Sequence, residues 1–276
     1  RWGEWAENTV APATPENSRY DSPGGSATPE EGRSSAGRRS STRRRALAPE
    51  EALASLAARG NAEAVTVTLS LVEDEARRAI LSYQALKVAA KHGQANVCQA
   101  LTTDRAEGGA AWAAEVAAVL LVAAQYGHAD TVSVLAAAAG DERQRIAAVD
   151  ARDEDGTCPL AVASFHGQHD AVQRLVTLNA NVDGVDNDGY TPLMWAAFKA
   201  RTQTAQVLVE ARADVLHISK EGNTALIYAA YSGADEIVET LLAHGADTAH
   251  RNLRGSTAAE VAAQQGSAEL AAFISQ

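Results

Sequence analysis

The sequence has few cysteines and no long apolar run. Its 276 residues include two cysteines, Cys98 and Cys158, which are far apart and form no C-x-x-C pair. This scarcity argues against a disulfide scaffold and a thiolate zinc site, and it favours a reducing, intracellular compartment. No apolar segment reaches the roughly 18 uncharged residues of a transmembrane helix, so we expect no membrane span. The alanine-rich run 110–121 contains Glu115 and predicts a buried helix.

The short motifs that mark common catalytic sites are also missing. The chain has no G-x-S-x-G, no Walker A sequence, no H-E-x-x-H and no G-x-G-x-x-G that opens a strand–helix unit. The closest histidines are His166 and His169, with Asp170 beside them. We expect His166 at a helix end and His169 across the following turn, so they do not predict a metal site. The sequence therefore predicts no catalytic activity, no cofactor, no metal and no small-molecule substrate.

Acidic residues outnumber basic ones by 35 to 24, which gives a net charge of −11. Residues 46–276 carry a net charge of −13, whereas residues 1–45 carry +2. An acidic chain binds nucleic acid poorly and attracts basic surfaces, so a protein partner with a basic surface is expected and nucleic acid is not. The alternative is that the excess charge serves solubility alone.

A short segment recurs every 33 residues. Residues 155–160 read DGTCPL, 188–193 read DGYTPL, 221–226 read EGNTAL, and 254–259 read RGSTAA. The glycines fall at positions 156, 189, 222 and 255. A fixed step of this size is typical of stacked repeats, in which each unit buries its apolar face only against its neighbours.

A second recurring segment is rich in small residues and ends at a glycine. It reads VASFHG at 162–167 and YAAYSG at 228–233, and it is also found upstream as VAAKHG at 88–93 and VAAQYG at 122–127. Gly127 and Gly167 are 40 residues apart, which predicts an insertion of seven residues within 137–154.

These segments resemble the ankyrin repeat family, whose units open on Asp-x-Gly-x-Thr-Pro-Leu and contain Gly-Ala-Asp, intact here at 245–247. The resemblance implies an all-α solenoid of about seven helix-turn-helix units with loop or hairpin tips. It covers residues 48–276, with clear repeats in 155–276 and degenerate ones in 48–154. Residues 1–47 are a low-complexity tail of Arg, Ser, Pro and Glu, expected to be disordered or extended.

Individual residues fit this unit locally. Pro159 and Pro192 suit a first helical turn, and Thr191 can cap the helix that follows it, whereas Cys158 replaces that threonine and predicts a weaker cap. A left-handed glycine ends the helix at Gly167, Gly233 and Gly266. Ala200 stands at the equivalent position, where a positive φ would cost about 1 kcal/mol.

The family's histidine after Thr-Pro-Leu, which links neighbouring loops by hydrogen bonds, is absent here. Its positions are occupied by Ala161, Met194, Ile227 and Glu260. We therefore expect no such network between units, and cohesion mainly from apolar packing.

The resemblance implies that partners bind at the loop tips and at the exposed ends of the first helices. Phe165, Phe198 and Tyr231 occupy equivalent places in three consecutive units and predict an aromatic stripe flanked by Tyr126 and Tyr190. The polar residues predicted to accompany this stripe are His166, Lys199, Asn187, Asp188, Lys220 and Glu221. The alternative is that these rings pack on their neighbours and only close the groove. Trp195 and Tyr228 lie one step deeper and are predicted core residues.

The tail offers separate candidate contacts. Trp2 and Trp5 are large apolar side chains in a polar segment and suggest anchors on a partner. The basic run consists of Arg38, Arg39, Arg43, Arg44 and Arg45. It suggests a nuclear-localisation patch, a phosphorylation site at Ser41 or an electrostatic tether. Chloroplast, mitochondrion and nucleus stay open as compartments, although the tail's acidic residues are unusual in a transit peptide.

The sequence as a whole therefore predicts a non-catalytic protein–protein interaction scaffold or adaptor. Two alternatives stay open: a structural accessory subunit of a large intracellular or organellar complex, and a regulatory fragment of a longer enzyme.

Overall fold

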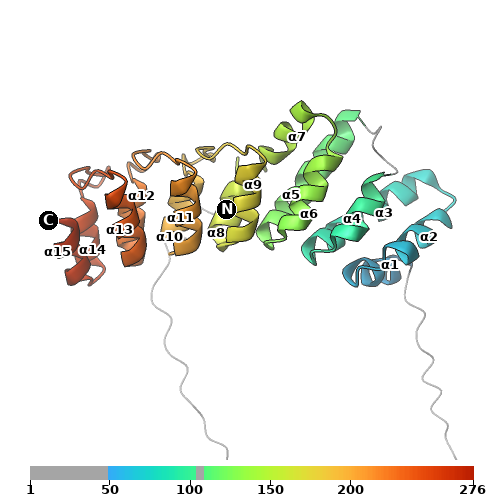
Figure 1. The fold of residues 1–276 in the computed structure, drawn as a ribbon, viewed down its shortest axis with the longest axis horizontal. Coiled ribbons are helices and arrows are strands. Elements are labelled where there is room, and N and C mark those ends of the chain that lie inside the picture. Colours follow the sequence, from blue (N-terminus) through green and yellow to red (C-terminus); the bar gives the residue numbers. More distant parts are fainter. Residues whose placement is uncertain (1–48, 104–108) are drawn as a thin grey trace, which may run out of the picture. The chain divides into compact units, whose positions relative to one another are not determined.

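The computed structural model describes residues 49–103 and 109–276, and these residues form fifteen helices and no strand (Figure 1). The first helices are α1 (Pro49–Ala58), α2 (Ala62–Ser70), α3 (Glu75–Lys91), α4 (Ala95–Thr103), α5 (Gly109–Gln125), α6 (Ala129–Ala138) and α7 (Glu142–Val149). The others are α8 (Pro159–His166), α9 (His169–Thr177), α10 (Pro192–Phe198), α11 (Thr202–Glu210), α12 (Ala225–Ser232), α13 (Asp235–Ala243), α14 (Ala258–Gln264) and α15 (Ala268–Ile274). The all-α solenoid is thus confirmed for the described part of the chain.

Several sequence-based predictions fall outside these residues. They are the tail 1–47 with Trp2, Trp5, Arg38, Arg39, Ser41, Arg43, Arg44 and Arg45, and they stay predictions.

The helices are arranged in two layers of antiparallel pairs. The first helices of successive pairs, α1, α3, α5, α8, α10, α12 and α14, pack on one another, and the second helices, α2, α4, α6, α9, α11 and α13, form the other layer. The turns within pairs lie along one edge of this array and the loop tips between pairs lie along the opposite edge (Figure 1). We call these the turn edge and the tip edge.

The helices begin as the sequence predicts. The hydroxyl of Thr191 accepts a hydrogen bond from the Met194 amide at 3.3 Å, and Thr257 forms a complete capping box with Glu260. Cys158 caps α8 without any side-chain hydrogen bond, as expected for a thiol in this place.

The first helices end in left-handed residues. Gly167 has a φ of 75° and Gly233 a φ of 66°, whereas Ala200 holds the same conformation with a φ of 52°. The second helices end likewise at Asn179 and Arg212, with φ of 63° and 66°. An L side chain is strained in this region, so these three non-glycine positions store conformational energy.

Leucines at the 33-residue step form the centre of the core. Leu160, Leu193 and Leu226 are at most 1% exposed. Met194 and Ile227, which occupy the place of the family's histidine, are buried as well. Apolar packing therefore fills the positions where the family usually has a polar link.

The expectation that units lack hydrogen bonds to one another is wrong. Along the tip edge, each tip donates a backbone hydrogen bond to the tip before it. The donors Asn187, Lys220 and Leu253 bind the carbonyls of Asp155, Asp188 and Glu221 at 3.0, 3.0 and 3.2 Å. These bonds use only backbone groups, so they need no histidine.

A second series of hydrogen bonds runs along the turn edge. In each case the side chain just after the left-handed residue reaches a carbonyl of the preceding unit. The pairs are Gln94 with Ala58, His128 with Lys91, Gln168 with Gln125, and Arg201 with Phe165, at 3.1, 3.0, 3.1 and 3.4 Å. Polar links at both edges therefore accompany the apolar core between them.

The insertion lies where the glycine spacing places it, and it contains helix α7. Asp141 caps this helix in a capping box with Gln144. The helix packs on α5 and α6 and belongs to no pair. None of the described helices is both long and apolar enough to cross a bilayer.

The left-handed alanine generates a stability prediction. Ala200→Gly should raise the free energy of unfolding by about 0.5–1 kcal/mol, because glycine removes the strain but gives the unfolded chain more freedom. Urea denaturation followed by circular dichroism measures the change. Ala114→Gly, at an exposed position within α5, is the control and should destabilise by about 1 kcal/mol. Destabilisation by Ala200→Gly would contradict the assigned strain.

Candidate partner-binding face

The predicted aromatic stripe lies on the first-helix layer at the turn edge. Phe165, Phe198 and Tyr231 come from the last turns of α8, α10 and α12. Phe165 and Phe198 are half-buried, whereas Tyr231 is 38% exposed. Tyr126 follows α5 and is 41% exposed. We call these four residues the stripe.

The rings of the stripe also contact deeper aromatic residues. The Phe198 ring centroid lies 5.9 Å from those of Tyr228 and Tyr231 and 6.2 Å from that of Trp195. The Phe165 ring lies 5.4 Å from Trp195. Phe198 therefore has a packing role, which is the alternative raised from the sequence, while Tyr126 and Tyr231 keep the exposure that a binding surface requires.

Tyr190 does not flank the stripe on the surface, as the sequence analysis expected. It is 9% exposed and stacks on Trp195 with centroids 4.6 Å apart, and Tyr228 lies 5.1 Å away on its other side. Burial raises the pKa of its phenol well above the usual range. A tyrosine between two other rings has little surface to offer a partner, so the prediction of an exposed Tyr190 is wrong.

Trp195 and Tyr228 take the deeper positions predicted for them. Tyr228 is 5% exposed, and Trp195 is partly buried against the core. The Trp195 indole Nε1 donates to Oδ2 of Asp186 at 2.9 Å. Burial raises the pKa of the Asp186 carboxyl, although amide donors such as that of Tyr190 oppose this shift. A polar contact thus fixes the tryptophan ring on which Phe165 rests.

Three cationic or titratable side chains surround the Phe165 end of the stripe. The Lys199 ammonium lies over the Phe165 and Phe198 rings, 4.6 and 4.9 Å from their centroids. The His166 ring lies 5.1 Å from that of Phe165. Burial, and then the positive charge of Arg201, lowers the pKa of Lys199. Burial, Arg201 and Lys199, in that order, lower the pKa of His166.

The four predicted tip residues are exposed, and each also contacts another tip residue. The Asn187 amide donates to the Glu154 carbonyl at 3.2 Å, and the Lys220 amine donates to the Asn187 carbonyl. The Asp188 carbonyl accepts the Lys220 backbone amide, and the Glu221 carboxylate accepts the Asn223 side chain at 3.0 Å. These residues therefore hold adjacent tips together and still face solvent.

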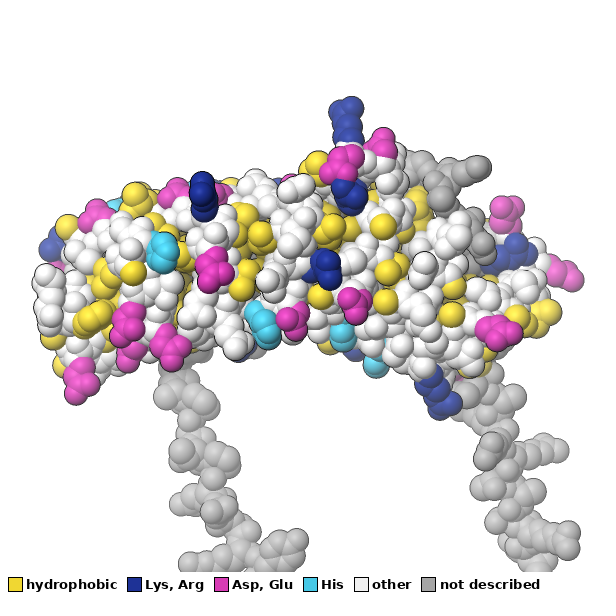
Figure 2. Space-filling view, in the orientation of Figure 1, with side chains coloured by type: hydrophobic (Ala, Val, Ile, Leu, Met, Phe, Trp, Pro, Cys, Tyr) yellow, Lys and Arg dark blue, Asp and Glu magenta, His cyan; other side chains and the backbone are white. Residues whose placement is uncertain are grey.

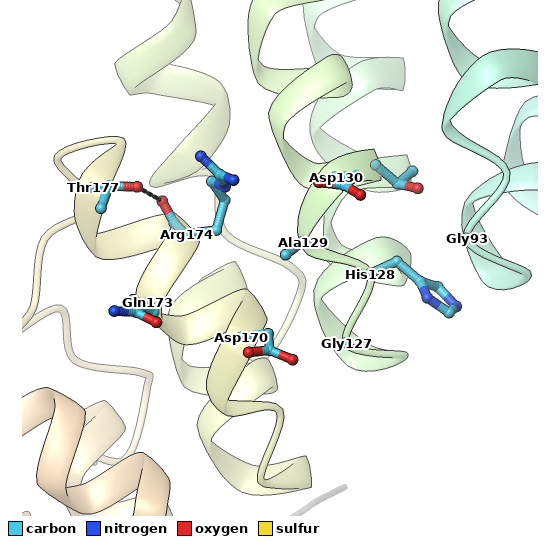
Figure 3. A pocket seen from close by; sticks show the side chains of 10 residues that line it. Gly93, Gly127, His128, Ala129, Asp130, Asp170, Gln173, Arg174 and Thr177 are labelled. Atoms are coloured by element: carbon cyan, nitrogen blue, oxygen red, sulfur yellow. Dashed lines mark hydrogen bonds between the residues drawn. The ribbon is translucent and has the colours of Figure 1, made fainter.

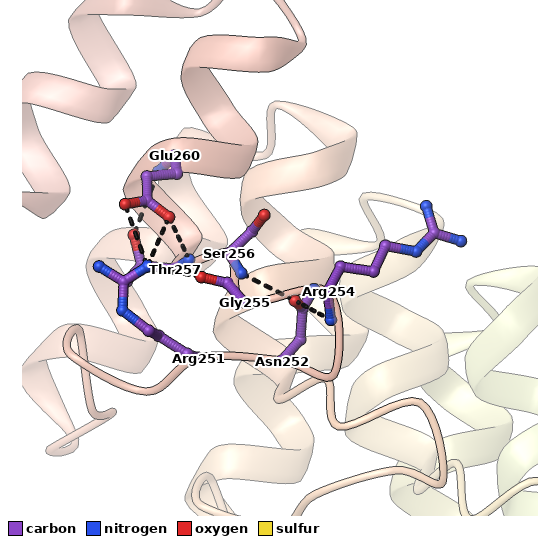
Figure 4. Close-up of polar contacts among 7 residues, drawn as sticks. All are labelled: Arg251, Asn252, Arg254, Gly255, Ser256, Thr257 and Glu260. Carbon is purple, nitrogen blue, oxygen red and sulfur yellow. Dashed lines mark hydrogen bonds and ion pairs between the residues drawn. The ribbon is translucent and has the colours of Figure 1, made fainter.

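The sequence analysis missed a repeated turn at the tips. Asp153, Asp186 and Asn252 lie at 33-residue intervals, and the side-chain Oδ1 of each accepts two backbone amides, two and four residues later. Figure 4 shows Asn252 with the amides of Arg254 and Ser256. Asn and Asp at this spacing were the available signal.

A polar groove of about 530 Å³ lies between α6 and α9 on the second-helix layer (Figure 3). Its lining includes His128, Asp130, Thr131, Asp170, Gln173 and Arg174. His169 beside it pairs with Asp170 at 3.3 Å. His166 ends α8 and His169 begins α9, as predicted. Within residues 49–103 and 109–276, no three His, Cys, Asp or Glu side chains gather as a metal site would require.

Both cysteines are buried free thiols. Cys98 is 0% exposed and Cys158 3%. Burial raises the pKa of Cys98 to about 12 and also raises that of Cys158. Neither thiol is therefore a reactive thiolate near neutral pH.

Paired helices stacked in two layers, with aromatic side chains aligned along one edge, define a repeat protein of the interaction type. A family model of ankyrin repeats, three copies long, matches residues 120–219 and 212–276. The match spans more than half of the chain, which therefore belongs to the ankyrin repeat family. Ankyrin repeats are generally protein–protein interaction modules and typically non-catalytic. The predicted total of about seven units stays a prediction upstream of residue 120.

No match was found among curated proteins. Figure 2 shows one face of the protein, on which acidic side chains are dispersed and histidines lie toward the turn edge.

The lowered pKa of His166 generates a pH prediction. Its usual pKa is 6.5, so as pH falls through that value the unfolded chain takes up a proton before the folded chain does. Wild-type stability therefore decreases, and His166→Gln should lose less stability between about pH 7.5 and about pH 5.5. Urea midpoints at the two pH values measure this difference. Equal losses in the two proteins would show that His166 is not held neutral by its surroundings.

Proposed function

We propose that this protein is a non-catalytic adaptor that holds a protein partner against the stripe, with the loop tips as a second contact. The observation that carries the proposal is the alignment of Tyr126, Phe165, Phe198 and Tyr231 on successive first helices, with two of the rings about 40% exposed. Aromatic side chains concentrated on one face are the usual composition of an interaction hot spot.

The remaining parts of the proposal concern the setting of this contact. Tail residues 1–47 would add a further contact through Trp2 and Trp5 or through the basic run that contains Ser41. The protein would work in a reducing compartment inside the cell, with the chloroplast, mitochondrion and nucleus as alternatives. Its partner is a protein, and the acidic net charge supports basic rather than nucleic-acid surfaces at long range.

The accessory-subunit alternative makes a different prediction from the adaptor. Affinity capture from the source cell should return one large assembly with wild type and stripe variants alike if the chain is a permanent subunit. An adaptor should return a discrete partner that stripe variants lose. The fragment alternative requires that the source cell contain a longer product of the same gene.

The stripe generates a binding prediction. Phe165→Ala with Phe198→Ala should weaken binding of the captured partner by at least ~2 kcal/mol, measured by calorimetry. Because Phe198 also packs against the core, Phe165→Ala with Tyr231→Ala is the cleaner pair, and it should have a similar effect.

The third phenylalanine is the matched control. Phe273 on α15 is 42% exposed, and its replacement by alanine should leave the affinity unchanged. Urea denaturation of each variant separates lost binding from lost folding. Unchanged affinity in folded Phe165→Ala/Tyr231→Ala protein would refute the proposal.

A further inference from the structure

The stripe ends in a group of basic side chains, although the chain has a net charge of −11. Lys199 follows α10, Arg201 precedes α11, and His166 ends α8. We call these three residues the cationic cluster. All three surround one ring, that of Phe165.

The cationic cluster is held in place by its neighbours. Arg201 Nε donates to the Phe165 carbonyl at 3.4 Å, and its side chain lies across Gly167, where an added Cβ would be 2.6 Å from the Arg201 Cδ. Lys199 is fixed over the faces of Phe165 and Phe198. The two positive charges are thus positioned before any partner arrives.

These charges are not neutralised within the described residues. Neither Lys199 nor Arg201 has a carboxylate within ion-pair distance there, and the acid at the start of α9, Asp170, is paired with His169. The cations act on one another instead, since Arg201 contributes to the lowered pKa of Lys199 and both contribute to that of His166. An anion placed among like charges that are partly removed from water would be attracted by each of them.

We propose that the stripe binds an acidic segment of its protein partner, in which a carboxylate contacts Lys199 and Arg201 while a neighbouring apolar side chain covers Phe165. This inference rests on the proposed function and specifies the chemistry of the partner. It differs locally from the basic surface suggested by net charge. Distant charges are screened beyond about 8 Å at physiological salt, so side chains at the contact decide its specificity.

The surroundings favour a peptide segment over other anions. A free phosphate would leave the rings of Phe165 and Tyr231 uncovered. A nucleic acid would bring its many charges close to a protein of net charge −11, whereas a short acidic segment meets only the cationic cluster.

The test is a selection of random dodecapeptides displayed on phage against the intact chain, followed by affinity measurement of the enriched peptides. We expect peptides with Asp or Glu next to an apolar residue. Their affinity should fall at least tenfold for Lys199→Gln/Arg201→Gln. Glutamine already stands at the equivalent positions, as Gln265 for Lys199 and as Gln94 and Gln168 for Arg201, so the turn-edge hydrogen bond can persist.

Lys220→Gln is the matched control, because it removes one exposed positive charge from the tip edge and should leave the affinity unchanged. Enriched peptides that are neutral or basic, or acidic peptides that bind Lys199→Gln/Arg201→Gln as tightly as wild type, would overturn the inference.

The same peptides separate this inference from the proposed function. Basic or neutral peptides whose binding is lost in Phe165→Ala/Tyr231→Ala would overturn the acidic-segment inference and leave the stripe as a binding face. Peptides indifferent to both double variants, or no enrichment at all, would overturn both.

Discussion

The structure depends on one constraint: each helix pair contacts only the pairs beside it. The core between pairs is a row of leucines, exemplified by Leu193 and Leu226, and hydrogen bonds join the pairs at both edges. A side chain therefore meets the residue that occupies the same place 33 positions away. This is why three residues that are far apart in sequence, Phe165, Phe198 and Tyr231, form one surface.

The same constraint explains why the stripe is a firm surface. Its rings rest on Trp195 and Tyr228, and Trp195 is fixed by its hydrogen bond to Asp186. Side chains already held in place lose little further freedom when a partner binds. The cationic cluster shares this property, since its lysine lies over the rings and its arginine forms part of the turn-edge series.

Much of the fold could be predicted from the sequence, because the glycines, the caps and the left-handed Ala200 are local features that repeat. The backbone bonds between tips could not, since they carry no side-chain signature. The burial of Tyr190 also escaped prediction, because it depends on Trp195 and on Tyr228 of the next unit. Helix α7 was missed although its capping box can be read in the sequence. Among site residues, repetition aligned the stripe but could not show that Arg201 reaches Phe165.

Hydrogen–deuterium exchange of the intact chain with and without its bound partner tests the central claim most directly. The account predicts slower exchange at the ends of α8, α10 and α12 and in the turns after them, where the stripe and the cationic cluster lie. Slower exchange confined to the second-helix layer, in α9, α11 and α13, or to the tip edge alone, would contradict it.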